Sequence, residues 1–182
     1  MPVTRRNVAI YLGSGLAACT LPIASLLAAV AEHAEGVGQR LASVARLDRD
    51  KSFWRGEVSE ESFAVLFRED TERPFTSPLN DEKRAGTYVC AACYLPLFSS
   101  EAKFDSGTGW PSFTAPVSDV AVGKKRDFLL LLPRTEYHCA RCGGHQGHVF
   151  DDGPKPTGQR WCNNGVALRF VPADEALPAL RG

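Results

Sequence analysis

The sequence predicts a mainly β fold, an antiparallel β domain with a few peripheral helices. Short runs typical of strands alternate with clusters of Gly, Pro, Asp and Asn through the second half of the chain. Four cysteines form two Cys-x-x-Cys pairs, each at the end of a predicted strand. The 182 residues are 44% hydrophobic and 23% charged, which is typical of one globular domain and not of a disordered chain.

The charges are balanced, with 21 Lys plus Arg against 21 Asp plus Glu. Binding to a phosphate backbone needs a basic surface, so we expect no nucleic-acid partner. We expect a monomer. The balance is uneven along the chain, because residues 1–31 contain Arg5 and Arg6 but no acidic residue. A separate leader is therefore indicated.

Residues 1–31 are predicted to be an export signal. Two arginines precede 25 uncharged residues, which Gly, Ser, Thr and Pro dilute too much for a strong membrane span. The segment TRRNVA at 4–9 resembles a twin-arginine signal, which exports folded proteins, and Ala29-Val30-Ala31 offers a cleavage site. Two alternatives remain, lipidation at Cys19 and an uncleaved anchor. All three place the domain outside the cytoplasm, in the periplasm or on the outer face of the membrane.

The elements after the leader can be placed in order. Residues 32–50 are interpreted as a linker or loose helix. Ser59 followed by Glu60 and Glu61 predicts the start of a helix over 59–69, where apolar residues recur at helical spacing. The domain itself is expected over 51–175, followed by a tail at 176–182. Its predicted strands are 87–90, 128–132, 136–139 and 166–171.

The two cysteine pairs, Cys90 with Cys93 and Cys139 with Cys142, predict a metal site. A Cys-x-x-Cys turn presents two sulfurs on one side, which is half of a tetrahedral zinc site. Four thiolates leave no open position on the metal, so the predicted role is structural. The alternative is two disulfides, since the leader implies an oxidising compartment. Zinc is favoured because a disulfide within such a turn is more often redox-active than structural.

Cys162 is the one cysteine outside the leader and the two pairs. A lone cysteine is usually a small buried apolar residue, but a reactive thiol needs a cation or hydrogen-bond donors and a positioned proton donor. Residues that meet these needs lie beside Cys162 or directly after the second cysteine pair: Arg160, Asn163, Asn164, His145 and His148. The presence of these residues near Cys162 favours a catalytic role for its thiol.

The segment KFDSGTGWPSF at 103–113 predicts a tight loop that presents Trp110. Its glycines are not a phosphate loop, because no Gly-Lys-Ser/Thr follows. An indole face beside a thiol suits a small soft group such as the methyl of a thioether or sulfoxide, although an aromatic residue in a β domain is more often part of the core.

Three blocks of the sequence carry a resemblance: TERPFTSPL at 71–79, GTYVCAACYLPLFSSEAKFDSGTGWPSF at 86–113, and CARCGGHQGHVFDDGPKPTGQRWCNNGVALRF at 139–170. They resemble the methionine-R-sulfoxide reductase B family, over about residues 53–171. The resemblance implies two antiparallel β-sheets with peripheral helices and structural zinc on the four paired cysteines. It further implies that Cys162 is the nucleophile and that a pocket is lined by Trp110, His145, His148 and Asn164.

The chain departs from the family pattern at several positions. Thr108 stands where many members carry a second, resolving cysteine. Gln146, Trp161, Asn163 and Gly165 stand where we expect an aliphatic residue, Tyr or Phe, an aliphatic residue and Ser, respectively. The expected reaction reduces methionine-R-sulfoxide in oxidised protein or peptide through a Cys162 sulfenic acid, with His148 and His145 assisting. The expected reductant is an external thiol, either a thioredoxin-like or glutaredoxin-like protein or a small thiol. The alternatives are a zinc-stapled binding module without turnover and a general thiol oxidoreductase that uses the cysteine pairs.

Overall fold

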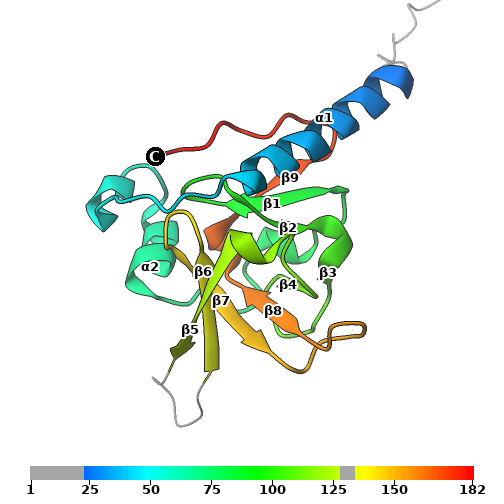
Figure 1. Ribbon diagram of the computed structural model, residues 1–182. Helices are drawn as coiled ribbons and strands as arrows, with labels where there is room; N and C mark the ends of the chain where they lie inside the picture. The colour runs from blue at the N-terminus through cyan, green and yellow to red at the C-terminus, as the bar shows by residue number, and fades with distance from the viewer. Residues whose placement is uncertain (1–22, 128–133) are drawn as a thin grey trace, which may run out of the picture.

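A computed structural model describes residues 23–127 and 134–182. Two antiparallel sheets and two α-helices make up this part of the chain, with short 3₁₀ turns between them, as the sequence predicts (Figure 1). The helices are α1 (Ile23–Ala42) and α2 (Glu60–Arg68). The three-stranded sheet has the order β2 (Pro96–Ser99), β1 (Gly86–Cys90) and β9 (Leu168–Pro172). The six-stranded sheet has the order β3 (Lys103–Phe104), β4 (Ser112–Phe113), β8 (Arg160–Asn163), β7 (His145–Phe150), β6 (Arg134–Cys139) and β5 (Val122–Asp127).

The predicted helix at 59–69 is confirmed as α2. Ser59 caps it by accepting a hydrogen bond from the Ser62 amide at 3.0 Å, and two glutamates occupy its first turn. The predicted strands at 87–90 and 136–139 are β1 and β6, and the one at 166–171 is β9 preceded by a 3₁₀ turn. The predicted strand at 128–132 lies outside the described residues.

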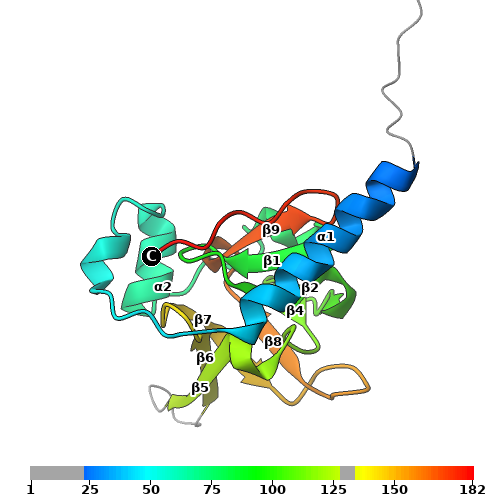
Figure 2. The same cartoon turned by 45° about the horizontal axis from the view of Figure 1, so that its top comes forward.

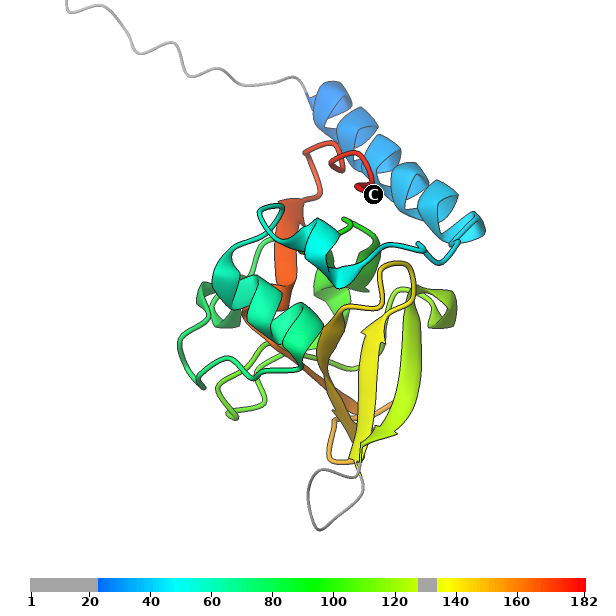
Figure 3. The same cartoon turned by 90° about the vertical axis from the view of Figure 1, so that its left-hand side faces the viewer.

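Buried aromatic rings join the two sheets. Phe98 of β2 stacks on Phe113 of β4 with ring centroids 4.2 Å apart, and Tyr137 of β6 meets Trp161 of β8 edge-on at 4.9 Å. All four rings are almost fully buried, and such packing is worth more than the buried area alone. This core fixes β8 and its neighbours β4 and β7 against the smaller sheet. Figure 3 shows β5, β6 and β7 extending away from α1.

Helix α1 runs without a break from residue 23 through the predicted end of the leader and into the predicted linker. Its first half exposes Ile23, Leu26, Leu27 and Val30. Its second half is docked: the His33 ring is buried, with Nδ1 2.8 Å from the Glu175 carbonyl oxygen and Nε2 2.8 Å from Thr87 Oγ1. Within residues 23–127 and 134–182, neither helix is long and apolar enough to cross a membrane.

Residues 43–50, the rest of the predicted linker, continue without helix and pack Val44 and Leu47 against the core. The predicted tail is also attached to the domain. It begins beside α1, where Arg40 donates a hydrogen bond to the Leu177 carbonyl at 3.0 Å, and then runs away from the helix (Figures 1 and 2), so that Arg181 reaches the first cysteine pair. The Arg181 guanidinium donates hydrogen bonds to the carbonyls of Ala91 and Ala92 at 2.6 and 2.9 Å. The tail therefore braces the turn between Cys90 and Cys93.

Candidate active site and metal centre

The four paired cysteines meet between the two sheets. Cys90 ends β1, Cys139 ends β6, and their sulfurs and those of Cys93 and Cys142 all lie within 4.8 Å of one another. The close sulfur pairs are Cys90 with Cys142 at 3.6 Å and Cys93 with Cys139 at 3.5 Å. A disulfide bond needs about 2.05 Å, so these thiols are not bonded to each other. The disulfide alternative is therefore wrong for this structure.

The donor set fits a tetrahedral metal ion. With a zinc to sulfur distance of about 2.3 Å, tetrahedral geometry places sulfurs about 3.8 Å apart, close to the observed separations. Both cysteine turns have the same backbone. In each, the first cysteine amide donates to the carbonyl five residues on, and its carbonyl accepts from the amide four residues on, all at 2.9 Å. The residues four positions on, Tyr94 and Gly143, both have positive φ.

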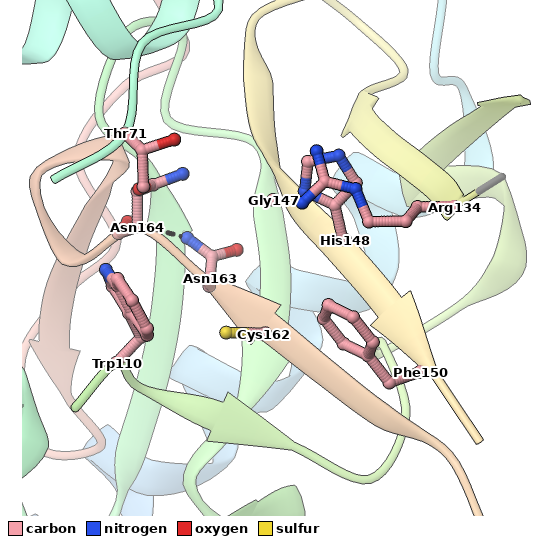
Figure 4. Close-up of a pocket in the computed structure, with 9 residues that line it drawn as sticks. All are labelled: Thr71, Trp110, Arg134, Gly147, His148, Phe150, Cys162, Asn163 and Asn164. Carbon is pink, nitrogen blue, oxygen red and sulfur yellow. Dashed lines mark hydrogen bonds between the residues drawn. The ribbon is translucent and has the colours of Figure 1, made fainter. Parts of the chain in front are cut away.

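A pocket opens beside Cys162 in the larger sheet (Figure 4). Cys162 lies between the rings of Trp110 and Phe150. The pocket has a volume of about 110 Å³, which suits one side chain rather than a folded segment. Strand register explains the convergence, because Cys162 of β8 is opposite Ser112 of β4 on one side and His148 of β7 on the other. The complete lining is Thr71, Trp110, Arg134, Gly147, His148, Phe150, Cys162, Asn163 and Asn164.

The surroundings of Cys162 act on its thiol in opposite directions. Burial raises the pKa of Cys162, while the charge of Arg160 and hydrogen bonds from Thr108 and Arg160 lower it. Arg160 is itself held in place. Its guanidinium donates to both carboxylate oxygens of Asp152 at 2.8 and 2.9 Å and lies 4.3 Å from the centre of the Phe150 ring. The cation is therefore fixed beside the thiol without lining the pocket.

His148 is oriented by a carboxylate. Its Nε2 lies 2.8 Å from Oδ2 of Asp127, and Arg134 donates to the same oxygen at 2.8 Å. Burial lowers the pKa of His148, and the hydrogen bond to Asp127 opposes this shift. Asp127 and Arg134 come from the facing ends of β5 and β6.

His145 occupies a different place from the one that the resemblance implies. It does not line the pocket but is buried behind His148, with the two ring centroids 5.5 Å apart. Its Nδ1 lies 2.9 Å from a carboxylate oxygen of the buried Glu136. Lys125 also contacts Glu136, at 3.1 Å. This arrangement supports the position of His148 from behind.

Glu72 of the TERPF segment organises the other side of the pocket. Its carbonyl accepts a hydrogen bond from Trp110 Nε1 at 2.9 Å, and its amide donates to Asn164 Oδ1 at 3.0 Å. Its buried carboxylate accepts from the Gly165 amide. Asn164 in turn donates through Nδ2 to the Gln146 carbonyl at 2.9 Å. The indole and the amide of the predicted pocket are thus both tied to one residue.

The structure therefore brings Trp110, His148, Cys162 and Asn164 to one pocket and places Arg160 and His145 directly behind it. Sequence reasoning missed Asp127, Arg134, Glu72 and Phe150. Asp127 and Arg134 flank a segment that the sequence suggested was one more strand, so nothing local marked them as partners. Glu72 and Phe150 were inside the resembling blocks, which were the available signal.

Comparison with known proteins identifies the family. Residues 58–172 match the SelR domain. The chain is 52% identical over 131 residues to the peptide methionine sulfoxide reductase MsrB of Pseudomonas putida (strain W619), covering 72% of this chain and 98% of that relative. It is 54% identical over 119 residues to the MsrB of Bradyrhizobium diazoefficiens, covering 65% and 86% respectively. The chain belongs to the methionine-R-sulfoxide reductase B family.

One departure from the family pattern has a steric reason. A Cβ atom on Gly165 would lie 1.9 Å from Ser77 Oγ, so the expected serine does not fit at position 165.

Trp161, which replaces the expected Tyr or Phe, fills the core between Phe98 and Tyr137, and its Nε1 donates to Gln159 at 3.2 Å. Thr108, where the resemblance implies a resolving cysteine in many members, shares a hydroxyl network with Ser106 and Ser112.

Proposed function

We propose that this protein reduces the R epimer of methionine sulfoxide in oxidised proteins and peptides, with Cys162 as nucleophile. The observation that carries the proposal is the placement of the Cys162 thiol in a pocket between the Trp110 and Phe150 rings, with His148 on the adjacent strand. The apolar rings suit the methyl group and the chain carbons of a thioether, and His148 suits the sulfoxide oxygen. The similar proteins named above are peptide methionine sulfoxide reductases.

The first step removes the sulfoxide oxygen. The Cys162 thiolate attacks the sulfoxide sulfur and forms a sulfur to sulfur bond, while the sulfoxide oxygen takes up two protons and leaves as water. Water then attacks the Cys162 sulfur, the sulfur to sulfur bond breaks with its electron pair going to methionine, and Cys162 becomes a sulfenic acid as one proton is released. Arg160 and Thr108 support the thiolate that this step requires.

Departure of the oxygen needs a proton, and His148 is the residue placed to donate it. Its Nε2 is engaged with the Asp127 carboxylate, which leaves Nδ1 as the nitrogen that gains and loses the transferred proton. Asp127 stabilises the imidazolium while His145 packs behind the ring. Asn164, held by Glu72 and Gln146, supplies a fixed amide at the opposite wall.

The enzyme is regenerated by an external thiol. A thiol attacks the Cys162 sulfenic acid, water leaves, and a mixed disulfide forms; a second thiol then releases Cys162 and a disulfide product. No other described cysteine lies outside the metal cluster. Thr108 lies within hydrogen-bond reach of Cys162 but has no sulfur, so this chain uses the external route directly.

We propose zinc as the metal on Cys90, Cys93, Cys139 and Cys142, in a structural role. When bound, the ion neutralises thiolate charge and holds the two turns, and hence both sheets, together. Four protein ligands leave no position for water or substrate. The metal therefore takes no part in the reaction at Cys162.

We also propose that the protein is exported with residues 1–31 as the signal. The docked part of α1 supports this, because the first buried residue of the helix is His33, directly after the predicted cleavage point. Cleavage after Ala31 removes the exposed apolar half and leaves the docked half in place. Edman sequencing of secreted protein tests this; a mature chain that starts at Cys19 or at the initiator methionine contradicts it.

Incubation of residues 32–182 with separate R and S epimers of a methionine sulfoxide peptide and dithiothreitol tests the main proposal. We expect turnover of the R epimer alone. Binding of the peptide without turnover would support the binding-module alternative. Reduction of unrelated disulfides through the cysteine pairs would support a general thiol oxidoreductase, which a tightly held stoichiometric metal excludes.

A further inference from the structure

Buried side-chain hydrogen bonds connect the nucleophile strand to the metal centre. Gln146 lies in β7, Asn163 follows Cys162 in β8, and both side chains are fully buried. Asn163 Nδ2 donates to Gln146 Oε1 at 3.3 Å, and Gln146 Nε2 lies 3.5 Å from Cys90 Sγ. Both residues stand where the family pattern predicts aliphatic residues. In the structure, these two departures from the pattern are hydrogen-bonded to each other.

The direction of these bonds is set by their partners. Asn163 Nδ2 also donates to the Asn164 carbonyl at 2.8 Å, and a carbonyl only accepts. Asn163 Oδ1 therefore accepts from the Tyr137 hydroxyl, at 2.6 Å. Gln146 Oε1 must face the Asn163 donor, which turns the Gln146 N–H groups toward Cys90. An N–H donor on this sulfur is the partner that a metal-bound thiolate needs.

The same residues hold the backbone around the nucleophile. The Gln146 carbonyl accepts hydrogen bonds from both the amide and the side chain of Asn164, each at 2.9 Å. The Tyr137 hydroxyl lies 3.3 Å from the Cys162 carbonyl oxygen. A Cβ on Gly147 would lie 1.9 Å from that oxygen, so β7 and β8 are in direct contact here.

We infer that Gln146 and Asn163 are positioning residues that tie the four-cysteine metal site to the strand that carries Cys162. Gln146 supplies the hydrogen bond to the metal-bound sulfur of Cys90. Asn163 orients the Gln146 amide and is itself oriented by Tyr137. An effect transmitted by this bridge is reciprocal in binding free energy, so changes beside the nucleophile alter retention of the metal.

The rate at which the metal-loaded protein releases zinc to a chromogenic chelator tests the bridge. Gln146→Met keeps the side-chain length but removes both hydrogen bonds. We expect release about 10-fold faster or more, because loss of a partner of a metal ligand typically costs 10 to 100-fold in affinity. Asn163→Leu contacts no metal-site cysteine, yet it should accelerate release in the same direction. The double variant should match Gln146→Met, since both substitutions act through one bond.

Gln159→Met is the matched control. Gln159 directly precedes β8 and accepts a hydrogen bond from Trp161 of that strand, but it does not reach the metal site. It should release zinc at the wild-type rate. In cobalt-substituted protein, Gln146→Met should shift the sulfur to metal charge-transfer band to lower energy, and Gln159→Met should not. Wild-type release in Asn163→Leu, additive effects in the double variant, or purified protein without bound metal would each overturn the inference.

A milder variant protects the test against failed folding. Tyr137→Phe removes only the hydroxyl that orients Asn163, and it should accelerate zinc release by a smaller factor; an unchanged rate contradicts the bridge. The metal readout does not depend on the proposed function. If the wild-type protein fails to reduce sulfoxide, the proposed function is wrong and zinc release still decides the inference. If it does reduce sulfoxide, Gln146→Met should lower kcat and leave KM nearly unchanged.

Discussion

The metal centre and the nucleophile pocket place the same kind of side chain in opposite surroundings. In the metal centre, two turns with the same backbone present four sulfurs to one another within 4.8 Å. At the pocket, Cys162 lies near the cation of Arg160 on its own strand, while the Thr108 hydroxyl and the Trp110 and Phe150 rings come from separate segments of the chain. The spacing of the sequence thus places the thiols of the proposed metal site, whereas the surroundings of the proposed nucleophile depend mostly on tertiary assembly.

The largest effect is expected at the metal centre. Cys93→Ser should lose the metal and unfold the domain, because structural zinc contributes on the order of 10 to 16 kcal/mol of binding free energy, comparable with a whole domain's stability. Metal analysis and thermal unfolding measured by circular dichroism check this. A variant that melts like wild type without metal would remove the distinction between the two thiol environments.

Cys162→Ser should abolish activity but leave the metal and the fold intact, the opposite of the result expected for Cys93→Ser. We expect no detectable turnover of the R epimer, because no other described thiol faces the pocket. The stability change should stay within about 0.5 kcal/mol, since the substitution touches neither the core nor the metal. Steady-state assays, metal content and thermal unfolding are measured together. Substantial residual activity contradicts the assignment of the nucleophile.

His148→Ala should lower kcat by about 10² to 10⁴-fold, the usual contribution of a positioned acid or base. Asp127→Asn keeps the shape of the partner but removes its charge, so it should cause a smaller loss in the same direction. Wild-type kinetics in His148→Ala would assign the acid role to His145 or to water.

The pH profile sharpens this point. The reaction needs one proton on the pair formed by Cys162 and His148, whichever of them holds it in the free enzyme. Burial moves the pKa of His148 below its ordinary 6.5 and the pKa of Cys162 above its ordinary 9.0. We therefore expect kcat/KM to be flat between these pKa values, to fall below the first as both groups become protonated, and to fall above the second as both lose their protons. A peak confined near pH 7.5 contradicts these directions.

The smallest effect is expected at Thr108. After one equivalent of substrate, dimedone should trap a sulfenic acid on wild-type Cys162. Thr108→Cys should instead form a disulfide with Cys162 and raise the thioredoxin-driven rate severalfold, because an internal thiol resolves the sulfenic acid. Mass spectrometry and coupled assays check this, with Ser106→Cys as a neighbouring control. A wild-type disulfide between Cys162 and a metal-site cysteine would show that a resolving partner exists.

The features that could be predicted from the sequence depend on local signals, and those that could not depend on tertiary arrangement. The metal site was predictable from spacing alone, and α2 from Ser59 and its two glutamates, because these signals are local. Strands β7 and β8 were not predicted, since HQGHVF and RWCN carry functional residues in place of alternating apolar ones. Pairing of Asp127 with His148 depends on strand register across β5, β6 and β7, which no local pattern encodes.

The brace from Arg181 to the first cysteine turn has a consequence for biosynthesis. Cys139 follows Cys93 by 46 positions, and Arg181 follows Ala92 by 89. At about 5 to 20 residues per second, a ribosome leaves Cys90 and Cys93 as a two-thiol half-site for roughly 2 to 9 seconds before the other ligands are made. The proposed metal can therefore bind all four sulfurs only late in synthesis, and a reducing compartment keeps the first pair of thiols from oxidising during that interval.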